Sequence, residues 1–423
     1  MNDVIIYLNS LGLHKVKPGL ERINKMLGFL ENPQDKAPSV IIAGTNGKGS
    51  VASTVASVLK AHGYKTGLYT SPHLTRISER ITINGEEISI DELYRLILEI
   101  KKTSTYLSEE PSYFEVLTAA AFLYFSERKV DFSVLEVGMG GRWDATNVVL
   151  PIVSVITNIS KDHVEFLGDN IVHIALEKAG VVKKGVPVVT AAKEEALEEI
   201  VNIALQKRAP ISIMGKDFIV KGQNTEDFSY SGTIWNLYHL NFSLSGLYQL
   251  ENVSLAIAAL ESISQFHGIK IDEKHLRKGL SSTKWEGRLE IIRKNPPLIL
   301  DGAHNPAAAG ALRKSLEAMF PEMQFVFLVG MLSDKDHDNY LKEIAQVAQS
   351  IITTNVPSDR GITAETLAAM AKRHVKMTTV INDFNEAFKE VEKLSSPVCI
   401  TGSLYLIGAI KQLMKCADTE LTN

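Results

Sequence analysis

The strongest constraint on the fold is a regular alternation of short β-branched segments with helical segments, which begins near residue 39. Val40-Ile41-Ile42 predicts a buried strand, residues 51–62 a helix that ends at Gly63, and residues 66–69 the next strand. Strands at residues 132–137, 152–157 and 186–190 continue the alternation, with a long helix over residues 113–128. This order is typical of parallel βαβ units, so we expect the first half to be a doubly wound α/β domain.

Two later segments change the pattern. Residues 211–244 contain short alternating runs separated by Gly, Asn, Asp and Ser, which favours a small antiparallel sheet. Lys294-Asn295-Pro296-Pro297 forms a stiff break, after which strands are expected at residues 298–300, 325–329, 351–353, 378–381 and 398–401. We therefore expect two domains, residues 1–295 and a smaller, Rossmann-like α/β domain at residues 296–423.

Charge and hydropathy narrow the classes of partner. The 423 residues include 45 Lys and Arg and 49 Asp and Glu, with a formal net charge of -4 and no long block of one sign. This balance argues against a protein that coats nucleic acid or a membrane surface, and it favours small-molecule partners. The longest apolar stretches fall short of the roughly 20 residues that span a bilayer.

The N-terminus and the cysteines indicate a cytoplasmic protein. Met1-Asn2-Asp3-Val4 lacks the basic flank and cleavage site of a signal peptide. Cys399 and Cys416 are the two cysteines, and they form neither a zinc motif nor a disulfide framework. We expect both to be ordinary thiols in a reducing compartment.

A glycine-rich segment between the first predicted strand and helix indicates phosphate binding. It reads Gly44-Thr45-Asn46-Gly47-Lys48-Gly49-Ser50, so backbone N–H groups can converge on an anion while Lys48 supplies charge for the β and γ phosphates. Gly49 stands where the usual motif has Ser or Thr, and we therefore expect another residue to bind magnesium. The alternative is a glycine-rich turn without a ligand.

The chain resembles the folylpolyglutamate synthases of the ATP-dependent Mur ligase superfamily. The resemblance extends over nearly the whole chain and rests on several motifs in the family's order. They are the phosphate loop, Thr70-Ser71-Pro72-His73 with Asn84-Gly85, the segment Leu135 to Asn147, Asp162-His163, Glu177-Lys178-Ala179-Gly180, Trp285 to Glu290, Asp301-Gly302-Ala303-His304-Asn305-Pro306 and Thr401-Gly402-Ser403-Leu404-Tyr405. Each motif alone could arise by chance, but the set is specific.

The resemblance implies a magnesium-nucleotide site. Ser71 and Glu136 match residues that coordinate the phosphate-bridging magnesium, and His163 matches a ligand of a second metal ion. Hard oxygen ligands suit magnesium. From the residues alone, Ser71 could instead cap a turn, Glu136 could form a salt bridge at a strand end, and His163 could be an ordinary loop histidine.

Further roles are implied on the same basis. The family places Thr45 to Ser50, Asn252, Arg288 and Asp301 on ATP, and His304, Ser403 and Tyr405 at the site of the incoming glutamate. Lys178 matches a lysine that is carbamylated by carbon dioxide, which requires a free amine and hence a lowered pKa. Asp144 matches a carboxylate near the reaction centre. Without the resemblance, Lys178 would be a solvated helix residue and Asp301 part of a polar turn.

The implied reaction is the ATP-dependent extension of the γ-carboxyl of a tetrahydrofolate with L-glutamate, through an acyl phosphate. Relatives that also make dihydrofolate have Asp-Leu where this chain has Lys17-Pro18, which leaves open whether dihydropteroate is a substrate. A Mur-type cell-wall ligase is the alternative enzyme, although its amino-sugar nucleotide domain should precede the phosphate loop. A nucleotide-binding switch without ligase activity is the alternative class. We expect a monomer.

Overall fold

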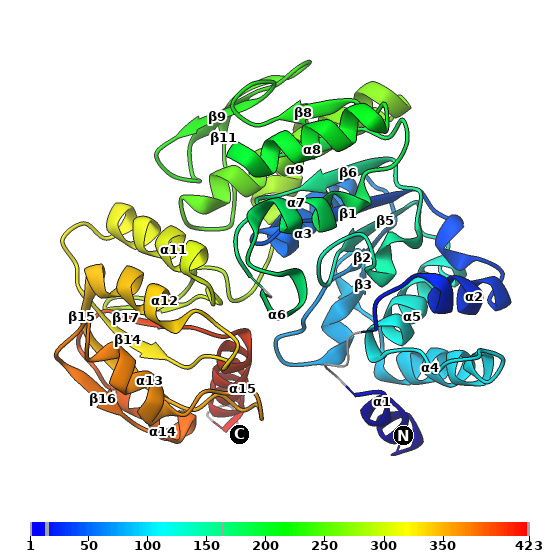
Figure 1. Ribbon diagram of the computed structural model, residues 1–423. Coiled ribbons are helices and arrows are strands. Elements are labelled where there is room, and N and C mark those ends of the chain that lie inside the picture. The colour runs from blue at the N-terminus through cyan, green and yellow to red at the C-terminus, as the bar shows by residue number, and fades with distance from the viewer. Residues whose placement is uncertain (1, 13–16, 163, 421–423) are drawn as a thin grey trace.

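The computed structural model describes residues 2–12, 17–162 and 164–420. Figure 1 shows two α/β units, a larger one that contains the N-terminus and a smaller one that ends in the C-terminal helix. Each is built on its own sheet. A mixed α/β chain with a doubly wound N-terminal part and a smaller C-terminal α/β part is thus confirmed.

The larger unit contains an eight-stranded sheet in the order β4-β3-β2-β5-β1-β6-β7-β8. Its strands are β1 (Ser39–Ala43), β2 (Thr66–Tyr69), β3 (Ile81–Ile83), β4 (Glu86–Glu87), β5 (Phe132–Glu136), β6 (Val153–Ile156), β7 (Val188–Thr190) and β8 (Ile211–Ile213). Strands β3 and β4 pair antiparallel at one edge, and the other neighbouring pairs are parallel. The central strands are buried on both faces, which explains why they read as continuous apolar runs.

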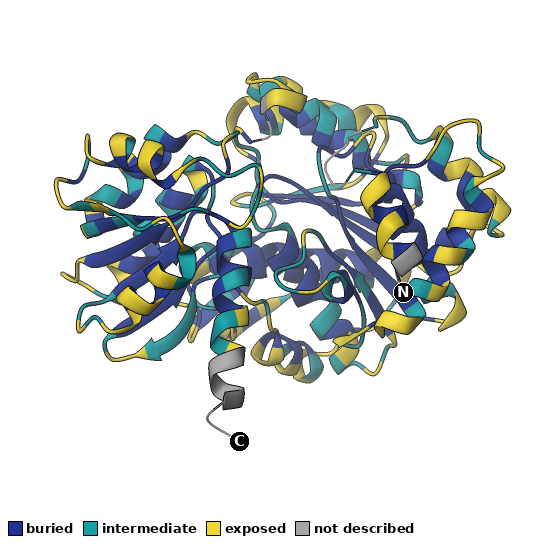
Figure 2. Ribbon diagram, turned by 90° about the horizontal axis from the view of Figure 1, so that it is seen from below, coloured by how far each residue is buried: buried dark blue, intermediate teal, exposed yellow. Residues whose placement is uncertain are grey.

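Helices cover both faces of this sheet and enclose two apolar cores, with buried strands between them (Figure 2). One core receives side chains from α1 (Asn2–Ser10), α2 (Glu21–Phe29), α4 (Ile90–Ser104), α5 (Tyr113–Glu127) and α8 (Glu194–Gln206). The other receives them from α3 (Lys48–Ala61), α9 (Tyr248–His267) and α10 (Glu273–Ser282). Two shorter helices are α6 (Val164–Leu167) and α7 (Ile171–Lys178).

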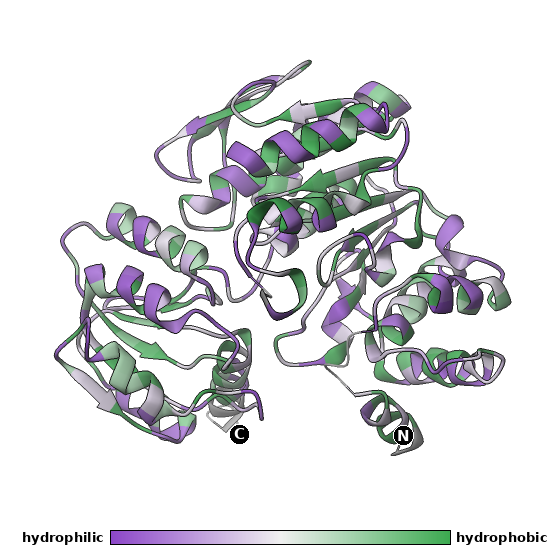
Figure 3. Cartoon of the chain, viewed as in Figure 1, coloured by the Kyte–Doolittle hydropathy of each residue, from purple (hydrophilic) through white to green (hydrophobic). Residues whose placement is uncertain are grey.

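Helix α4 shows how the sequence specifies these covering helices. Leu93, Leu96, Ile97 and Ile100 follow the helical period and are buried, whereas the opposite face is hydrophilic (Figure 3). Ser89 accepts a hydrogen bond from the backbone N–H three residues later and caps the helix. The apolar stripe therefore sets the face that packs on the neighbouring helices α5, α2 and α1.

A three-stranded antiparallel sheet confirms the expectation for residues 211–244, with two differences. It consists of β9 (Ile219–Gly222), β10 (Phe228–Ser231) and β11 (Asn236–Leu240). Residues 211–213 belong instead to the large sheet, where β8 pairs parallel with β7. The alternating runs within that range are residues 217–221, 233–238 and 240–244, and the middle strand β10 lies between the first two.

The C-terminal sheet has the order β12-β13-β17-β14-β15-β16. Its strands are β12 (Glu290–Lys294), β13 (Pro297–Leu300), β14 (Phe325–Val329), β15 (Ala348–Thr353), β16 (Thr378–Val380) and β17 (Val398–Thr401). Its helices are α11 (Pro306–Met319), α12 (His337–Ile344), α13 (Ala364–Ala371), α14 (Phe384–Glu392) and α15 (Leu404–Glu420). Five strands are parallel, and β12 pairs antiparallel with β13.

Strand β12 lies next to the domain boundary that the sequence predicts between residues 295 and 296. That position lies in the turn between β12 and β13, two paired strands of one sheet. The proline pair reads as a linker because it stiffens the chain, but here it forms a hairpin turn. Residues 290–294 therefore lie in the same sheet as residues 297–300, and the division into domains at 295 and 296 stays a prediction.

Within the described part of the chain, none of the helices combines the length and the apolar character that a membrane span requires.

Candidate active site

The phosphate loop lies between the end of β1 and the first residue of α3, Lys48. Gly44 and Gly47 have φ values of 135° and 86°, in the left-handed region that glycine adopts without steric penalty. A Cβ atom on Gly47 would lie 2.1 Å from Oδ1 of Asn252 on α9. The loop therefore needs glycine both for its backbone conformation and for its close contact with α9.

Hydrogen bonds from the segment after β6 hold the loop in place. Thr157 Oγ1 donates to the carbonyl of Asn46 at 2.7 Å, and the Asn46 N–H donates to Asn158 Oδ1 at 3.0 Å. Thr45 Oγ1 donates to the carbonyl of Ser160 at 3.0 Å. The Asn46 N–H is therefore engaged, whereas the first N–H groups of α3 have no acceptor within the helix and can bind an anion.

Glu136 and Ser71 come together at the carboxyl edge of the sheet, from the ends of β5 and β2. The Ser71 N–H donates to Glu136 Oε2 at 3.1 Å. Burial raises the pKa of Glu136, and the nearby charges of Lys48, Arg288 and Arg80 oppose that effect. Both residues line the cavity described below, and a carboxylate and a hydroxyl are oxygen donors of the kind that suits magnesium.

Lys178 and Asp144 lie behind the phosphate loop. Lys178 is 3% exposed, and its Nζ donates to the carbonyl of Gly44 at 2.7 Å. Burial, with a smaller contribution from the charge of Lys48, lowers the pKa of Lys178 to about 7. Asp144 accepts hydrogen bonds from the backbone N–H groups of Met139 and Thr146, and burial raises its pKa.

The C-terminal unit contributes Arg288 and Asp301 on the facing side. Asp301 accepts hydrogen bonds from Tyr248 OH at 2.7 Å and from the N–H groups of Leu289 and Ala303, each at 2.8 Å. Burial raises the pKa of Asp301, whereas the charge of Arg288 lowers it. Tyr248 begins α9, so this hydrogen bond connects the two units.

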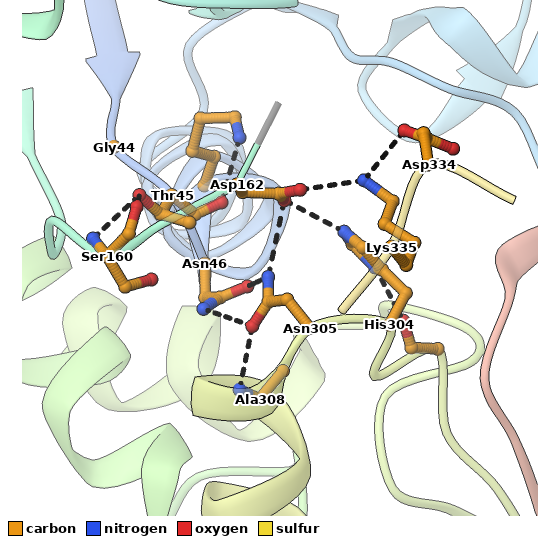
Figure 4. Close-up of polar contacts among 12 residues, drawn as sticks. Gly44, Thr45, Asn46, Ser160, Asp162, His304, Asn305, Ala308, Asp334 and Lys335 are labelled. Carbon is orange, nitrogen blue, oxygen red and sulfur yellow. Dashed lines mark hydrogen bonds and ion pairs between the residues drawn. The ribbon is translucent and has the colours of Figure 1, made fainter. Parts of the chain in front are cut away.

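Asp162, in the segment that carries α6, makes a second set of contacts between the units (Figure 4). Its carboxylate lies 2.7 Å from Lys335 Nζ and 3.1 Å from His304 Nε2, and it accepts a hydrogen bond from Asn305 Nδ2 at 3.2 Å. Asn305 Nδ2 also donates to Asn46 Oδ1 at 3.0 Å. A residue of the phosphate loop is thereby joined directly to the start of α11.

These groups surround one cavity of about 480 Å³ between the two units. The expected site residues that line it are Thr45, Asn46, Gly47, Lys48, Gly49, Ser50, Ser71, Glu136, Asn252, Arg288, Asp301, His304, Ser403 and Tyr405. Lys178 and Asp144 do not line it, and His163 lies outside the described residues. The two sides of the cavity can thus hold a phosphate group and a second polar ligand next to each other.

Two family models match the chain. The Mur ligase middle domain matches residues 42–260, and the Mur ligase glutamate ligase domain matches residues 287–404. A Bacillus subtilis dihydrofolate synthase/folylpolyglutamate synthase is 36% identical over 411 residues, which cover 95% of this chain and 96% of that protein.

The chain belongs to the folylpolyglutamate synthase/dihydrofolate synthase family of Mur ligases.

Solved structures of this family agree with the fold. A folylpolyglutamate synthase from Thermotoga maritima superposes with a TM-score of 0.86 at 38% identity and covers 98% of this chain and 97% of its own. A Yersinia pestis folylpolyglutamate synthase/dihydrofolate synthase with Mn, AMPPNP and L-glutamate bound has a TM-score of 0.87 at 28% identity, with coverage of 97% and 98%. As a member of this family, the protein is an ATP-dependent ligase that uses a divalent metal.

Several residues of this ligase site have no role assigned by the motifs alone. Asp162 and Asn305 belong to the family motifs, but their contacts across the cavity appear only in the structure. Lys335 and Arg360 line the cavity from loops of the C-terminal unit. Their place in the sequence could have indicated a role in the site, because Lys335 follows β14 and Arg360 follows β15, at the edge where parallel sheets of α/β proteins bind ligands.

Proposed function

We propose that this ligase adds L-glutamate to the γ-carboxyl group of a reduced folate. The observation that carries the proposal is the shared cavity, with the phosphate loop and Glu136 on one side and His304, Ser403 and Arg288 on the other. The activities for which the full-length relatives are named support the substrate class. ATP, folate and glutamate would meet where the two units face each other.

The chemistry follows from the weakness of a carboxylate as an electrophile. The γ-phosphoryl group of ATP is transferred to the folate carboxylate, which forms an acyl phosphate and releases ADP. The uncharged amino group of glutamate then attacks the acyl carbon, and a tetrahedral intermediate collapses with loss of phosphate and a proton. Lys48 and the N–H groups at the start of α3 stabilise the charge on the transferred phosphoryl group.

Glu136 and Ser71 fit a magnesium ion. Glu136 is 5% exposed, it lines the cavity, and the charges that lower its pKa do not outweigh its burial. A cation at this position would compensate the buried carboxylate. A bound magnesium ion would neutralise part of the negative charge on the nucleotide phosphates.

Carbamylation of Lys178 is part of the proposal. The reaction joins the free amine to carbon dioxide and releases one proton, so it requires a neutral lysine. Burial of Lys178 and its pKa of about 7 support this condition, and Lys48 lies close enough to lower that pKa. A carbamate would convert the repulsion between the two lysines into an attraction. Labelling with ¹³CO₂ tests the step, because wild-type protein should show a carbamate NMR signal that Lys178→Met lacks.

Dihydrofolate synthesis is a second candidate activity, because the Bacillus subtilis relative is named for both reactions. Lys17 and Pro18 replace the Asp-Leu pair of bifunctional relatives. Lys17 Nζ donates to the carbonyl of Glu110 at 2.6 Å, so this cation is engaged with the loop before α5. We place tetrahydrofolate first and dihydropteroate second.

Glutamate-dependent release of ADP distinguishes these candidates. Tetrahydrofolate, dihydropteroate and a muramyl nucleotide are supplied in turn as the acceptor. Turnover with tetrahydrofolate supports the proposal, and turnover with the muramyl nucleotide alone contradicts it. Lys48→Ala should abolish turnover, whereas Lys60→Ala, an exposed lysine at the far end of the same helix, should retain it.

We further propose that the enzyme works as a monomer in the cytoplasm. The two sides of the cavity come from one chain, so catalysis needs no second copy to complete the site. Sedimentation at assay concentration tests this point, and an obligate dimer would contradict it.

A further inference from the structure

Three side chains with metal-binding groups meet on the outer side of the large unit. His62 caps the C-terminal end of α3, Asp272 caps the N-terminal end of α10, and His275 lies in the first turn of α10. One ligand atom from each lies within 4.8 Å of the other two. None of the three lines the cavity between the units.

The two helices that carry these residues are packed tightly. Ser57 Oγ donates to the carbonyl of Gly279 at 2.8 Å, and a Cβ atom on Gly279 would lie 2.5 Å from Cα of Val58. Such close packing fixes the end of α3 relative to the start of α10. The three side chains are therefore held together by the fold, which reduces the entropy lost when a ligand binds.

The distances within the cluster are close to those of a coordination sphere. His275 Nδ1 lies 2.6 Å from Asp272 Oδ2, and His62 Nε2 lies 3.8 Å from the same oxygen. Metal–ligand bonds of about 2.0–2.2 Å with tetrahedral angles require ligand atoms roughly 3.3–3.6 Å apart. Small side-chain rotations would bring both distances into this range.

Exposure and charge also favour a cation. The side chains of Asp272 and His275 are 56% and 37% exposed, whereas that of His62 is 9% exposed and held against Tyr64. The carboxylate of Asp272 accepts a hydrogen bond from the backbone N–H of His275 at 3.0 Å and lies 2.6 Å from its ring nitrogen, so it is held beside the histidine. The partial negative charge at the end of α3 offsets the partial positive charge at the start of α10.

We propose that His62, Asp272 and His275 bind one divalent transition-metal ion of the zinc, nickel or cobalt type. Two imidazole nitrogens and one carboxylate oxygen suit these ions, whereas magnesium prefers oxygen ligands. Binding at His275 Nδ1 removes the proton that this nitrogen shares with Asp272, and the neutral ring keeps its one proton on Nε2, so the ring changes tautomer and no net proton needs to be released. Without metal, His62 Nε2 accepts a hydrogen bond from the Asp272 N–H at 2.9 Å. In the metal-bound protein the same lone pair would bind the ion, and a water molecule would accept the hydrogen bond from the Asp272 N–H.

The bound ion would act as a clamp. Helix α3 begins at the phosphate loop, and its other end would be joined through the ion to α10. Because the ion binds the folded arrangement and not the separated helices, it would stabilise the folded protein.

Calorimetric titration with Ni²⁺ tests the site. The protein is first saturated with Mg²⁺ and ADP, so that the nucleotide site is occupied. Loss of even an outer-shell partner weakens metal binding by about 10–100-fold, so His275→Ala should weaken Ni²⁺ binding at this site by at least about tenfold. His239→Ala is the matched control, because His239 also pairs with an aspartate, Asp227, at 3.2 Å on the surface.

Asp272→Asn provides a second variant that preserves the helix cap, because asparagine caps helices as well as aspartate does. It should weaken Ni²⁺ binding as His275→Ala does, and both variants should retain wild-type ligase turnover in chelator-treated buffer. Equal Ni²⁺ affinity in wild type and His275→Ala, or no Ni²⁺ binding by wild type, would overturn the proposal. Equal weakening by His239→Ala would overturn it as well.

Discussion

Asp162 and Lys335 form an ion pair of 2.7 Å across the cavity, with side chains that are 6% and 7% exposed. One residue belongs to the larger unit and the other to the C-terminal unit. The same carboxylate contacts His304 and Asn305, and Asn305 contacts the phosphate loop through Asn46. The relative position of the two units is therefore connected to the geometry of the loop that binds phosphate.

Asp162→Ala should impair catalysis more than folding. In this variant Lys335 keeps its ion pair with Asp334 at 3.5 Å, so the buried cation is still compensated. The variant loses only the carboxylate that joins the two units. We expect kcat/KM for glutamate to fall by about tenfold or more, which corresponds to about 1.4 kcal/mol. Steady-state kinetics measures the effect, with Glu317→Ala, which removes an exposed partner of Arg313, as the control. Unchanged kcat/KM in Asp162→Ala would show that the ion pair does not position the units.

Gly408→Ala should separate the segment after β2 from α15. A Cβ atom on Gly408 would lie 2.0 Å from the carbonyl oxygen of Leu74, three residues beyond Ser71. Overpacking of this kind costs about 1–3 kcal/mol, and it would displace the segment that carries Ser71. We expect a lower kcat with little loss of secondary structure by circular dichroism. Gly28→Ala, at a helix position with open space around it, should leave kcat unchanged.

Lys178 should make the free energy of unfolding depend on pH. Its pKa is about 7 in the folded protein and 10.5 in the unfolded chain, so between these values the unfolded state binds more protons. Stability should therefore increase as pH rises from 7 to 10.5, by up to about 1.4 kcal/mol per pH unit. Urea unfolding in carbon-dioxide-free buffer measures this slope. Lys178→Met should flatten it, and Lys184→Met, at an exposed position, should not.

Tyr248→Phe should weaken nucleotide binding. The substitution removes the hydroxyl that donates to Asp301 Oδ2 and keeps the ring in place. Loss of one donor to a buried carboxylate costs about 1–3 kcal/mol. Asp301 lines the cavity, so a change in its position would alter the proposed nucleotide site. We expect the Kd for ADP to rise by at least about fivefold, measured by calorimetry. Tyr238→Phe, on an exposed tyrosine, is the control, and an equal effect of both would contradict the assignment.

Much of the fold could be predicted because its signals are local. Val40-Ile41-Ile42 forms the middle of β1, and Thr66–Tyr69 is β2 with the expected bounds, since buried parallel strands are continuous apolar runs. The order of strand, glycine-rich loop and helix around Lys48 likewise lies within a few residues of the chain. Such segments carry their periodicity and turn chemistry within themselves.

Pairing between distant segments was not predictable in the same way. Residues 211–213 look like part of the small sheet, yet they extend the large one, and β12 pairs with β13 across the Asn295-Pro296 turn. Both outcomes depend on which sheet edge lies nearby when the chain folds. An alternating or apolar run indicates that a strand forms, but it does not indicate which other strand it pairs with.

The sequence by itself determined most of the buried parallel strands, the phosphate loop and the residue types that chemistry would need. Only the tertiary structure decided that Asp162 meets Lys335, 173 positions away, and that Lys178 is buried beneath the phosphate loop. The physical reason is that periodicity and turn formation depend on neighbours in the chain. Charge pairing and pKa depend on neighbours in space, which the packing of two separate units brings together.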